Sequence, residues 1–442
     1  MHGFREIADA LSAQIMSGEL KPGERLPPQR DFAYRRGIAA STAARVYSEL
    51  ARRGLVTGET GRGTFVRLPT SRQAPALTEP ATAAIDLELN FPIVDEQAAM
   101  TGRAVAALLQ GSAMEDVSRP IGATGTPAAR AIVADHLRRG AWRADPETIV
   151  FAGNGRQAIA ATLSALAPPG SRFGVEALTY PVFKGLAARL GITLVPIACD
   201  TRGMLPDAIL RAHAAAPLSG LYVQPSLQNP VGTTMDAARR REIAAVLETT
   251  RLVAIEDGIY GFLTDEEPLA HYAPAHAVLV DSLSKRIAPG TTAGFIAAPL
   301  HMRGQIISSV RSGCWGPSGF PLALGLQMMS DGSAHRIGEL KREDAMSRNT
   351  LARRHLGNLR IDGDPRAYHV WATLPDHWRA DTFAMFAARR GIAVVPGSAF
   401  AVSPGHAPNA VRLALASPPL AVLADSLDVL NALAASSPDQ IE

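Results

Sequence analysis

Lysine is scarce in this chain, and one lysine has an unusual setting. The 442 residues include 44 lysines and arginines, and only four of these are lysines: Lys21, Lys184, Lys285 and Lys341. Lys285 lies in a mostly small and apolar stretch, directly beside Arg286. A primary amine can form a Schiff base with a carbonyl compound, whereas a guanidinium cannot. We therefore expect Lys285 to have a chemical role.

Other polar residues share the position of Lys285, just after an apolar segment. They are Asn154, Gly155 and Arg156 after residues 149–152, Asn229 after 220–223, Asp257 and Tyr260 after 252–256, and Ser282 and Ser284 after 278–282. Ligands of parallel sheets bind at the carboxyl ends of the strands, and free N–H groups at a helix N-terminus bind phosphate. We expect these residues to converge on one site, although each alone also fits an ordinary turn, packing or surface role.

The apolar pattern predicts the elements that must position these residues. We expect strands at residues 149–152, 172–175, 193–196, 220–223, 252–256, 278–282 and 295–298, with helices between several of them, for example at 156–166, 182–190 and 236–249. Alternating strands and helices predict an α/β body with a mostly parallel sheet. From about residue 335 to 442, strands near 367–373, 392–395 and 411–416 predict a smaller α+β subdomain.

Residues 1–68 have the pattern of a separate basic domain. They hold ten Arg and one Lys against seven Asp and Glu, a balance of 11 − 7 = +4, which leaves 3 − 4 = −1 for the rest of the chain. We expect helices at 4–16, 28–36 and 41–53, the last capped by Ser41 or Thr42, and short strands at 55–57 and 64–67. This order predicts a winged helix-turn-helix.

A winged helix-turn-helix binds double-stranded DNA with its third helix in the major groove. Phosphate contacts would position the domain, and base contacts would give specificity. The candidate contacts are Ser41, Thr42 and Arg45 on the third helix, Arg30 at the start of the second, and Arg62 and Gly63 in the wing. Residues 69–85, rich in Pro, Ala, Ser and Thr, predict a linker between this domain and the body at 86–442.

The composition excludes several classes of protein. No apolar run reaches about 18 residues without interruption, so no transmembrane helix and no membrane partner are expected. The first residues lack the apolar core of a signal peptide. Cys199 and Cys314 form neither a disulfide framework nor a zinc site, so no metal is expected. A reduced cytoplasm fits all of these features.

The domain at 1–68 resembles the winged helix of the GntR family of regulators. Between Phe4 and Val66 it has that family's first helix, its G-x-L-x-P-G-x-x-L-P turn, its R-x-x-A and Y-x-x-L helices and its G-x-G-T-F-V wing. The family usually has Ser-Arg at the start of the recognition helix, where this chain has Ala39 and Ala40. Base readout is therefore expected to rest on Thr42, Arg45 and the wing.

The body resembles the fold-type I pyridoxal-phosphate (PLP) enzymes of the aminotransferase family over about 350 residues. The motifs are, in chain order, G-N-G-R-Q, T-Y-P, Q-N-P-V-G, E-D-G-I-Y, S-L-S-K-x-x-x-P-G and V-R-L. The resemblance implies that Lys285 holds PLP as an aldimine and that Asp257 pairs with its pyridinium nitrogen. It also implies contacts of Asn229 and Tyr260 with the phenolic oxygen, of Tyr180 with the ring face, of Asn154, Gly155, Arg156, Ser282 and Ser284 with the phosphate, and of Arg412 with a substrate or effector carboxylate.

One position departs from the aminotransferase pattern. Seven residues after the lysine, where the family has an arginine that grips the phosphate, this chain has Thr292. A charge-assisted hydrogen bond is worth about 1.5–3 kcal/mol, so its loss would weaken cofactor binding by roughly 10- to 100-fold. We hypothesise that Arg156 restores the charge from the other side of the phosphate. The rival interpretation is a body that no longer uses PLP well.

A GntR-type head on an aminotransferase-type body is the architecture of the MocR-like regulators, which this chain resembles along nearly its whole length. The resemblance implies a homodimeric, DNA-binding transcriptional regulator that senses PLP, or an amino acid or amine, through an aldimine at Lys285. Two alternatives stay open. One is an aminotransferase, active or only weakly so, with an accessory head, and the other is a PLP-free ligand-sensing regulator.

Overall fold

A computed structural model of the protein describes residues 4–17, 19–21, 24–52, 55–59, 63–66, 83–110, 117, 121–403 and 407–438. The chain divides into two compact units. One contains Met1–Ala76 with Ser403–Pro408, and the other contains Leu77–Val402 with Asn409–Glu442. Within the described ranges, no helix is both long and apolar enough to span a bilayer.

The described part of the N-terminal unit has the predicted order of helices and strands, which are α1 (Phe4–Ser17), α2 (Gln29–Arg36), α3 (Ala40–Arg52), β1 (Val56–Glu59) and β2 (Gly63–Val66). The two strands are antiparallel and form the wing. Leu11, Phe32 and Val46 come from the three helices and lie buried in one small core. Because one apolar stripe of each helix faces this core, the remaining polar faces stay exposed to solvent.

The predicted cap of the third helix is wrong. Helix α3 begins at Ala40, and the Ala39 carbonyl accepts from the N–H groups of Thr42 and Ala43. Ser41 and Thr42 therefore lie inside the first turn. Serine and threonine favour the capping position in general, but here Ala39 occupies it, two residues before Ser41, after Gly37 has ended α2 with a left-handed φ of 61°.

The larger unit is built on a seven-stranded sheet. Its strand order is β4 (Ile149–Ala152), β12 (Gly294–Ala297), β11 (Ala277–Ser282), β10 (Val253–Asp257), β9 (Gly220–Val223), β5 (Arg172–Glu176) and β6 (Thr193–Ile197). Strand β12 is antiparallel to both of its neighbours, and the other pairs are parallel. The prediction of a mostly parallel sheet is confirmed.

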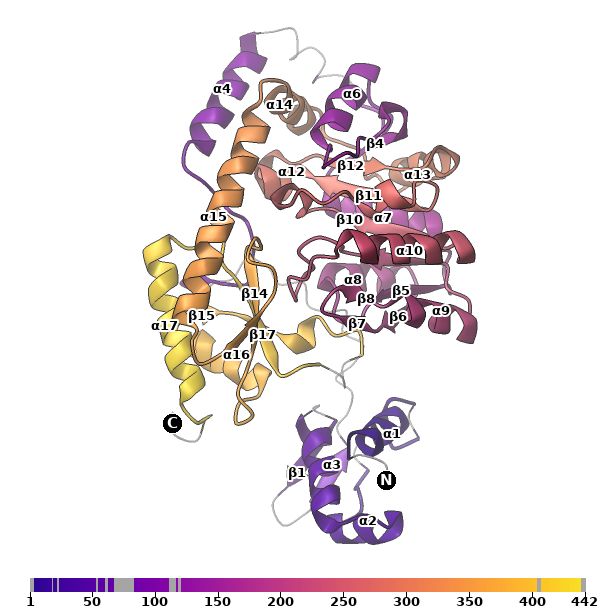
Figure 1. Cartoon of the computed structure of the whole chain (residues 1–442), viewed down its shortest axis with the longest axis vertical. Helices are drawn as coiled ribbons and strands as arrows, with labels where there is room; N and C mark the ends of the chain where they lie inside the picture. The colour runs from indigo at the N-terminus through magenta and orange to yellow at the C-terminus, as the bar shows by residue number, and fades with distance from the viewer. Residues whose placement is uncertain are drawn as a thin grey trace. The chain divides into compact units, whose positions relative to one another are not determined.

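Helices cover both faces of this sheet, as Figure 1 shows. One buried cluster joins the sheet to α7 (Gly155–Leu166), α8 (Pro181–Arg189) and α13 (Leu300–Ser312). A second cluster on the other face joins it to α4 (Gln97–Gln110), α6 (Pro127–His136), α9 (Pro206–Ala215), α10 (Ala237–Thr250), α11 (Leu269–Tyr272) and α14 (Gly319–Ser330). Strands buried on both faces read as continuous apolar runs, which is why the sequence revealed them.

A smaller α+β subdomain follows, as predicted. Its four-stranded antiparallel sheet has the order β13 (Arg360–Asp362), β14 (His369–Thr373), β17 (Ala410–Ala414) and β16 (Val395–Pro396). It packs with α15 (Ser333–His355), α16 (Ala380–Arg389) and α17 (Leu420–Ala435). Strand β3 (Ile85–Asp86), the first described strand after the wing, pairs with β15 (Ile392–Ala393) of this subdomain.

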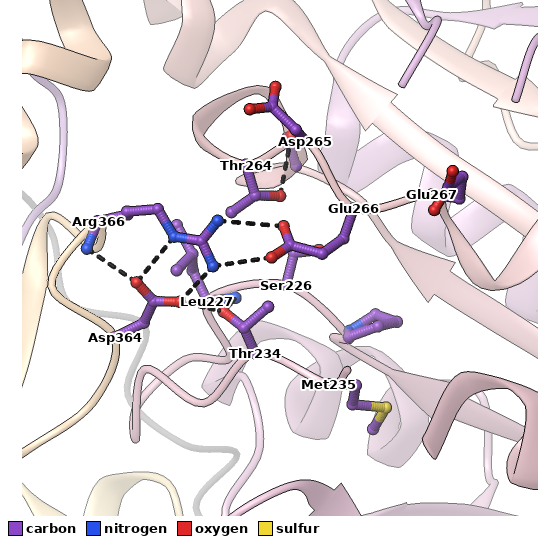
Figure 2. A network of polar contacts seen from close by, with 12 residues as sticks. Ser226, Leu227, Thr234, Met235, Thr264, Asp265, Glu266, Glu267, Asp364 and Arg366 are labelled. Atoms are coloured by element: carbon purple, nitrogen blue, oxygen red, sulfur yellow. Dashed lines mark hydrogen bonds and ion pairs between the residues drawn. The ribbon is translucent and has the colours of Figure 1, made fainter. Parts of the chain in front are cut away.

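An ion-pair network joins the small subdomain to the loop that carries Asn229. Figure 2 shows Arg366 between Asp364 and Glu266, with Thr234 beside Asp364. The Arg366 guanidinium lies 2.7 Å from Asp364 and 2.9 Å from Glu266, and Thr234 donates to Asp364 over 2.8 Å. This loop and the small subdomain are therefore tied together.

Two glycines allow that loop to meet the small subdomain at van der Waals distance. A Cβ on Gly232 would lie 3.1 Å from the Cα of Gly363, and both residues have positive φ angles, of 76° and 112°. The backbone N–H of Asp364 also donates to the Gly232 carbonyl over 2.9 Å. Glycine is required at both positions because any side chain would be strained and would push the two backbones apart.

Candidate functional site

Lys285 lies in α12 (Leu283–Arg286), directly after β11. Its Nζ atom lies 3.5 Å from the centre of the Phe91 ring and donates to the Asn90 carbonyl. Burial, together with the positive charges of Arg412 and Arg156, lowers the pKa of the Lys285 amine well below its ordinary value. A neutral amine is the nucleophilic form of lysine, so this environment prepares Lys285 for attack on a carbonyl carbon.

A second lysine supports the first. Lys341, on α15, is fully buried, and its Nζ donates to the carbonyls of Lys285 over 3.0 Å and Ile287 over 2.7 Å. Burial lowers the pKa of Lys341 to about 7. Lys341 thus fixes the backbone at the end of α12, and this fixes the direction in which the Lys285 side chain points.

Asp257 lies at the end of β10 and is buried. Its Oδ2 atom accepts from Tyr222 Oη over 2.6 Å and from Gln224 Nε2 over 2.9 Å, and its Oδ1 atom accepts from the Ile259 N–H over 3.2 Å. Burial raises the pKa of Asp257, while these three donors favour the carboxylate. A buried carboxylate with one weakly bonded oxygen can accept a further donor, such as a protonated ring nitrogen.

Arg412 reaches the same site from β17. Its Nη1 atom donates to Asn229 Oδ1 over 2.9 Å, and its Nη2 atom donates to the Glu88 carbonyl. Both Arg412 and Asn229 are buried, and Arg412 Nε has no partner among the described residues. The guanidinium thus retains a free donor inside the protein, as a binding site for a carboxylate requires.

Two tyrosines flank these groups. Tyr260 accepts from Asn90 Nδ2 over 3.5 Å, and burial raises the pKa of Tyr260 to about 12, so it stays protonated. Tyr180, at the start of α8, accepts from Arg156 Nε over 3.3 Å. Arg156, on the exposed first turn of α7, therefore holds the hydroxyl of the tyrosine that was predicted to cover a ring.

A small polar cradle lies at the N-terminus of α7. Asn154 caps this helix by accepting from the Gln157 N–H over 2.9 Å, and a Cβ on Gly155 would come within 2.9 Å of Ser282 Oγ. Ser282 Oγ and Ser284 Oγ lie 2.9 Å apart. The first N–H groups of a helix have no acceptor within it, so this end of α7 suits a phosphate.

Thr292, which stands where an arginine was expected, provides a further test of the cofactor. Its Oγ1 atom is buried and has no hydrogen-bond partner among the described residues. A buried hydroxyl without a partner is costly and indicates a group that a ligand would complete. An amine of low pKa, a buried carboxylate and a hydroxyl-lined helix N-terminus match the aldehyde, ring nitrogen and phosphate of PLP, so the residues present fit this cofactor.

Several residues of the site were missed by sequence reasoning. They are Glu88, Asn90 and Phe91, whose segment lies against Arg412 and Lys285, together with Glu176, Tyr222, Gln224 and Lys341. Glu176 and Gln224 lie at or just after the ends of β5 and β9, so the strand-end criterion that selected Asp257 also identifies them. Segment 88–91 carries no such signal, because only the fold brings it to the site.

The N-terminal unit presents three of the predicted DNA-contact residues fully on its surface. On α3, Ser41 and Arg45 are exposed and Thr42 is half-buried, and Arg30 is exposed on α2. Gly63 has a φ of 121°, and a Cβ there would lie 2.6 Å from Arg25 Nε. Arg25, which sequence reasoning missed, thus packs on the wing. Arg62 lies outside the described residues.

Comparisons with known proteins agree with both parts of the chain. The family model "Aminotransferase class I and II" matches residues 82–430, and the model "Bacterial regulatory proteins, gntR family" matches residues 4–66. An archaeal alanine:glyoxylate aminotransferase of known structure superposes with a TM-score of 0.72 at 23% identity, over 79% of this chain and 90% of that one. This last likeness shows the fold.

Two relatives resemble the chain over most of its length. The uncharacterized HTH-type transcriptional regulator YdeF of Bacillus subtilis is 28% identical over 420 residues, which cover 94% of this chain and 90% of the relative. The HTH-type pyridoxine biosynthesis transcriptional regulator PdxR of Corynebacterium glutamicum is 26% identical over 366 residues, 80% of this chain and 79% of the relative. Both are named as transcriptional regulators.

Proposed function

This chain belongs to the aminotransferase class I and II family and carries a GntR-family domain at its N-terminus, and from this premise we propose that it is a PLP-dependent, DNA-binding transcriptional regulator. Residues 1–68 bind DNA, residues 86–442 bind the cofactor, and residues 69–85 are the linker between these two domains. The signal is PLP, or an amino acid or amine that PLP captures, and Lys285 is the residue that reports it. The regulatory names of both relatives support this assignment over an enzymatic one.

The observation that carries the proposal is the double contact of segment 88–91. Its Glu88 carbonyl accepts from Arg412 and its Asn90 carbonyl accepts from Lys285, so backbone groups of the chain occupy the two side chains that would meet a ligand. A carboxylate at Arg412 competes with the first contact, and any group bonded to Lys285 removes the second. Ligand binding and the position of this segment are therefore linked.

Segment 88–91 is also well placed to pass a signal to the DNA-binding domain. It directly follows β3, which pairs with the small subdomain, and the predicted linker 69–85 ends at β3. A change in segment 88–91 is passed along a few residues of backbone to the linker. Only a ligand with different affinities for the two arrangements can drive such a change, and displacement of the carbonyls provides that difference.

The proposed contacts with the cofactor follow the site's geometry. When bound, PLP supplies an aldehyde that reacts with amines and a ring that draws electrons from the attached carbon. The residues that hold it are Lys285 at the aldehyde, Asp257 at the ring nitrogen, Asn229 and Tyr260 at the ring oxygen, Tyr180 on the ring face, and Asn154, Gly155, Arg156, Ser282 and Ser284 at the phosphate.

The DNA partner is double-stranded, and a dimer follows from how such domains read operators. A single helix-turn-helix reads only a few base pairs, and two-fold dimers bind two half-sites. We therefore propose a homodimer that works in the compartment that holds DNA, the cytoplasm in bacteria. The residues assigned to DNA are Arg30, Ser41, Thr42, Arg45, Arg62 and Gly63.

The visible absorption spectrum of the purified full-length protein tests the proposal. PLP is added and removed by desalting, and a Lys285→Ala variant is treated in parallel. A retained visible band that borohydride abolishes and the variant lacks is the expected result, together with a change in DNA affinity when amino acids are added. A wild-type protein without the band, but with amino-acid binding, would instead make the body a PLP-free sensor.

A second candidate function is catalytic. Lys285, Asp257 and Arg412 converge on one site, and the lowered pKa of Lys285 makes it competent to move a proton as a general base. These groups would support transamination, complete or partial. Steady turnover of an amino donor with a 2-oxoacid acceptor would establish the enzyme, whereas a spectral change without turnover supports the regulator.

A further inference from the structure

Behind Asp257 lies a set of buried polar residues to which the proposed function gives no role. Tyr222 on β9, Gln224 just after β9 and Glu176 at the end of β5 are each no more than 3% exposed. Strand β9 is the direct neighbour of β10 in the sheet order and β5 is the next strand beyond it, so Tyr222 and Gln224 meet Asp257 from one side and Glu176 lies behind Gln224. Burying polar side chains is costly unless their hydrogen bonds are satisfied.

The Gln224 amide bonds at both of its ends to proposed cofactor contacts. Its Nε2 atom donates to Asp257 Oδ2 over 2.9 Å, and its Oε1 atom accepts from the Asn229 N–H over 3.2 Å. Asp257 is assigned to the ring nitrogen and Asn229 to the ring oxygen. A single side chain thus sets the spacing between two residues that lie 28 positions apart in the sequence.

The backbone of Gln224 is itself held in place. Its N–H donates to Glu176 Oε1 over 2.9 Å. Burial raises the pKa of Glu176 to about 8, so at neutral pH this side chain is mostly uncharged and does not compete with Asp257 for a cationic partner. Gln224 therefore has little freedom to rotate away from either of its bonded neighbours.

Tyr222 completes the environment of Asp257. Its ring stacks on Phe183 at a centroid distance of 3.8 Å and an interplanar angle of 14°, and its hydroxyl donates to Asp257 Oδ2 over 2.6 Å. With Gln224, two donors fill the acceptor capacity of Oδ2, while Oδ1 holds one longer bond from Ile259. Oδ1 is therefore the oxygen left to bind a ring nitrogen.

We propose that Gln224 and Tyr222 are positioning residues for the PLP ring. Together they hold Asp257 as an anion, direct Oδ1 toward the ring nitrogen, and keep Asp257 and Asn229 at the separation that the ring requires. Neither residue touches the cofactor in this assignment, so each acts through Asp257 and Asn229. The inference rests on the proposed function, because it presumes that PLP occupies the site.

The test compares Tyr222→Phe and Gln224→Met with the wild-type protein. Phenylalanine keeps the stacked ring and removes one donor to Asp257, and methionine keeps the length of glutamine and removes both polar ends. Tyr368→Phe is the matched control, because Tyr368 is also a buried tyrosine that donates to a carboxylate, Asp344, over 2.9 Å. All four full-length proteins are loaded with PLP, and their visible spectra are titrated with pH.

The expected result is a shift of about one pH unit in the midpoint of the visible titration for each site variant, because each loses a donor to a charged group. Gln224→Met should also release PLP about tenfold more readily, measured by dialysis equilibrium. Tyr368→Phe should lower the melting temperature and leave the titration unchanged. A conservative variant, Tyr222→Phe, carries the test if Gln224→Met does not fold.

Two negative outcomes have different meanings. If the wild-type protein shows no visible band with PLP, the proposed function fails. If the wild type shows the band but both site variants titrate at the wild-type midpoint, the positioning role is overturned while the proposed function stands. An equal shift in Tyr368→Phe would also overturn it, since the effect would then reflect general loss of packing.

Discussion

Arg412 Nη1 donates to Asn229 Oδ1 over 2.9 Å, so the proposed anchor for the effector and a proposed contact of the cofactor ring are bonded directly to each other. Both side chains are buried, and Asn229 is also tied to Asp257 through Gln224. In the proposed function, effector and cofactor would therefore act on one network. Their coupling must be reciprocal, because a bound effector that favours one arrangement of this pair changes cofactor affinity by the same factor.

The first prediction concerns effector selection. Arg412→Lys keeps the charge but loses the planar pair of donors, so the affinity for an amino acid should fall by about 10- to 100-fold. The amine that corresponds to the same amino acid without its carboxylate should bind both proteins equally. Spectral titration of the PLP-loaded proteins measures both ligands. An equal loss for amine and amino acid would assign Arg412 a purely structural role.

The second prediction concerns the phosphate end of the site. Arg156→Gln should weaken PLP binding by about 10- to 100-fold if Arg156 replaces the arginine that is absent at Thr292. Adding Thr292→Arg to that variant should restore the affinity. Tyr180→Phe is the control, because it removes the 3.3 Å contact with Arg156 and leaves the guanidinium charge in place. Full PLP affinity in Arg156→Gln would contradict the hypothesis.

The third prediction concerns stability and pH. The folded protein raises the pKa of Glu176 to about 8, so it retains a proton that the unfolded chain releases near pH 4.5. This contribution to stability is complete below pH 4.5 and is lost as the pH rises through 8. Glu176→Gln stays neutral at all pH values. The melting temperature of the wild type should therefore fall relative to that of Glu176→Gln as the pH is raised from 5 to 8.5. A difference that stays constant with pH would refute the assignment.

The fourth prediction separates two kinds of DNA contact. Arg45→Ala should cost about 1–3 kcal/mol in binding to the specific operator and should relax specificity at one position. Arg30→Ala should weaken binding to specific and non-specific DNA alike. It should also reduce the slope of log affinity against log salt concentration by about one unit. Fluorescence anisotropy at several salt concentrations distinguishes the two variants. Identical behaviour would mean that Arg45 binds phosphate rather than a base.

The fifth prediction concerns segment 88–91. When an amino acid engages Lys285 and Arg412, the carbonyls of Asn90 and Glu88 lose their partners. Amide hydrogen exchange in peptides that cover this segment should therefore increase on addition of the effector to the PLP-loaded protein. Peptides of the buried strand β10 serve as the internal control. Unchanged exchange throughout the segment would show that effector binding does not alter segment 88–91 and is not passed on to the linker.

The sequence predicted the parts of the fold that depend on local pattern. Strands buried on both faces gave apolar runs, and Asp257, Asn229 and Lys285 were found because each follows such a run. The reversed direction of β12 was not predicted, because strand direction depends on the path of the chain through space. Local pattern also misplaced the start of α3 by one residue.

The residues that the sequence did not reveal are those joined over long distances in the chain. Asn90 meets Tyr260, and Glu88 meets Arg412, only because β3 is pinned beside β15. Lys341 supports Lys285 from a helix 56 positions later. Such partners carry no local signature. Glu176 and Gln224 differ, since both lie at strand ends, and an ordinary rule about parallel sheets points to them.

The scarcity of lysine makes this protein convenient for amine chemistry. Lys184 is half-buried and donates to the carbonyls of Ala399 and Ala401, and Lys341 is fully buried, which leaves Lys21 as the exposed lysine side chain of the described residues. Surface lysines commonly give aldehydes an unspecific background. Here that background is reduced to one side chain in the N-terminal unit. A Lys21→Arg protein would therefore offer aldehyde probes few reactive surface amines, and Lys285 would be the main lysine that they label.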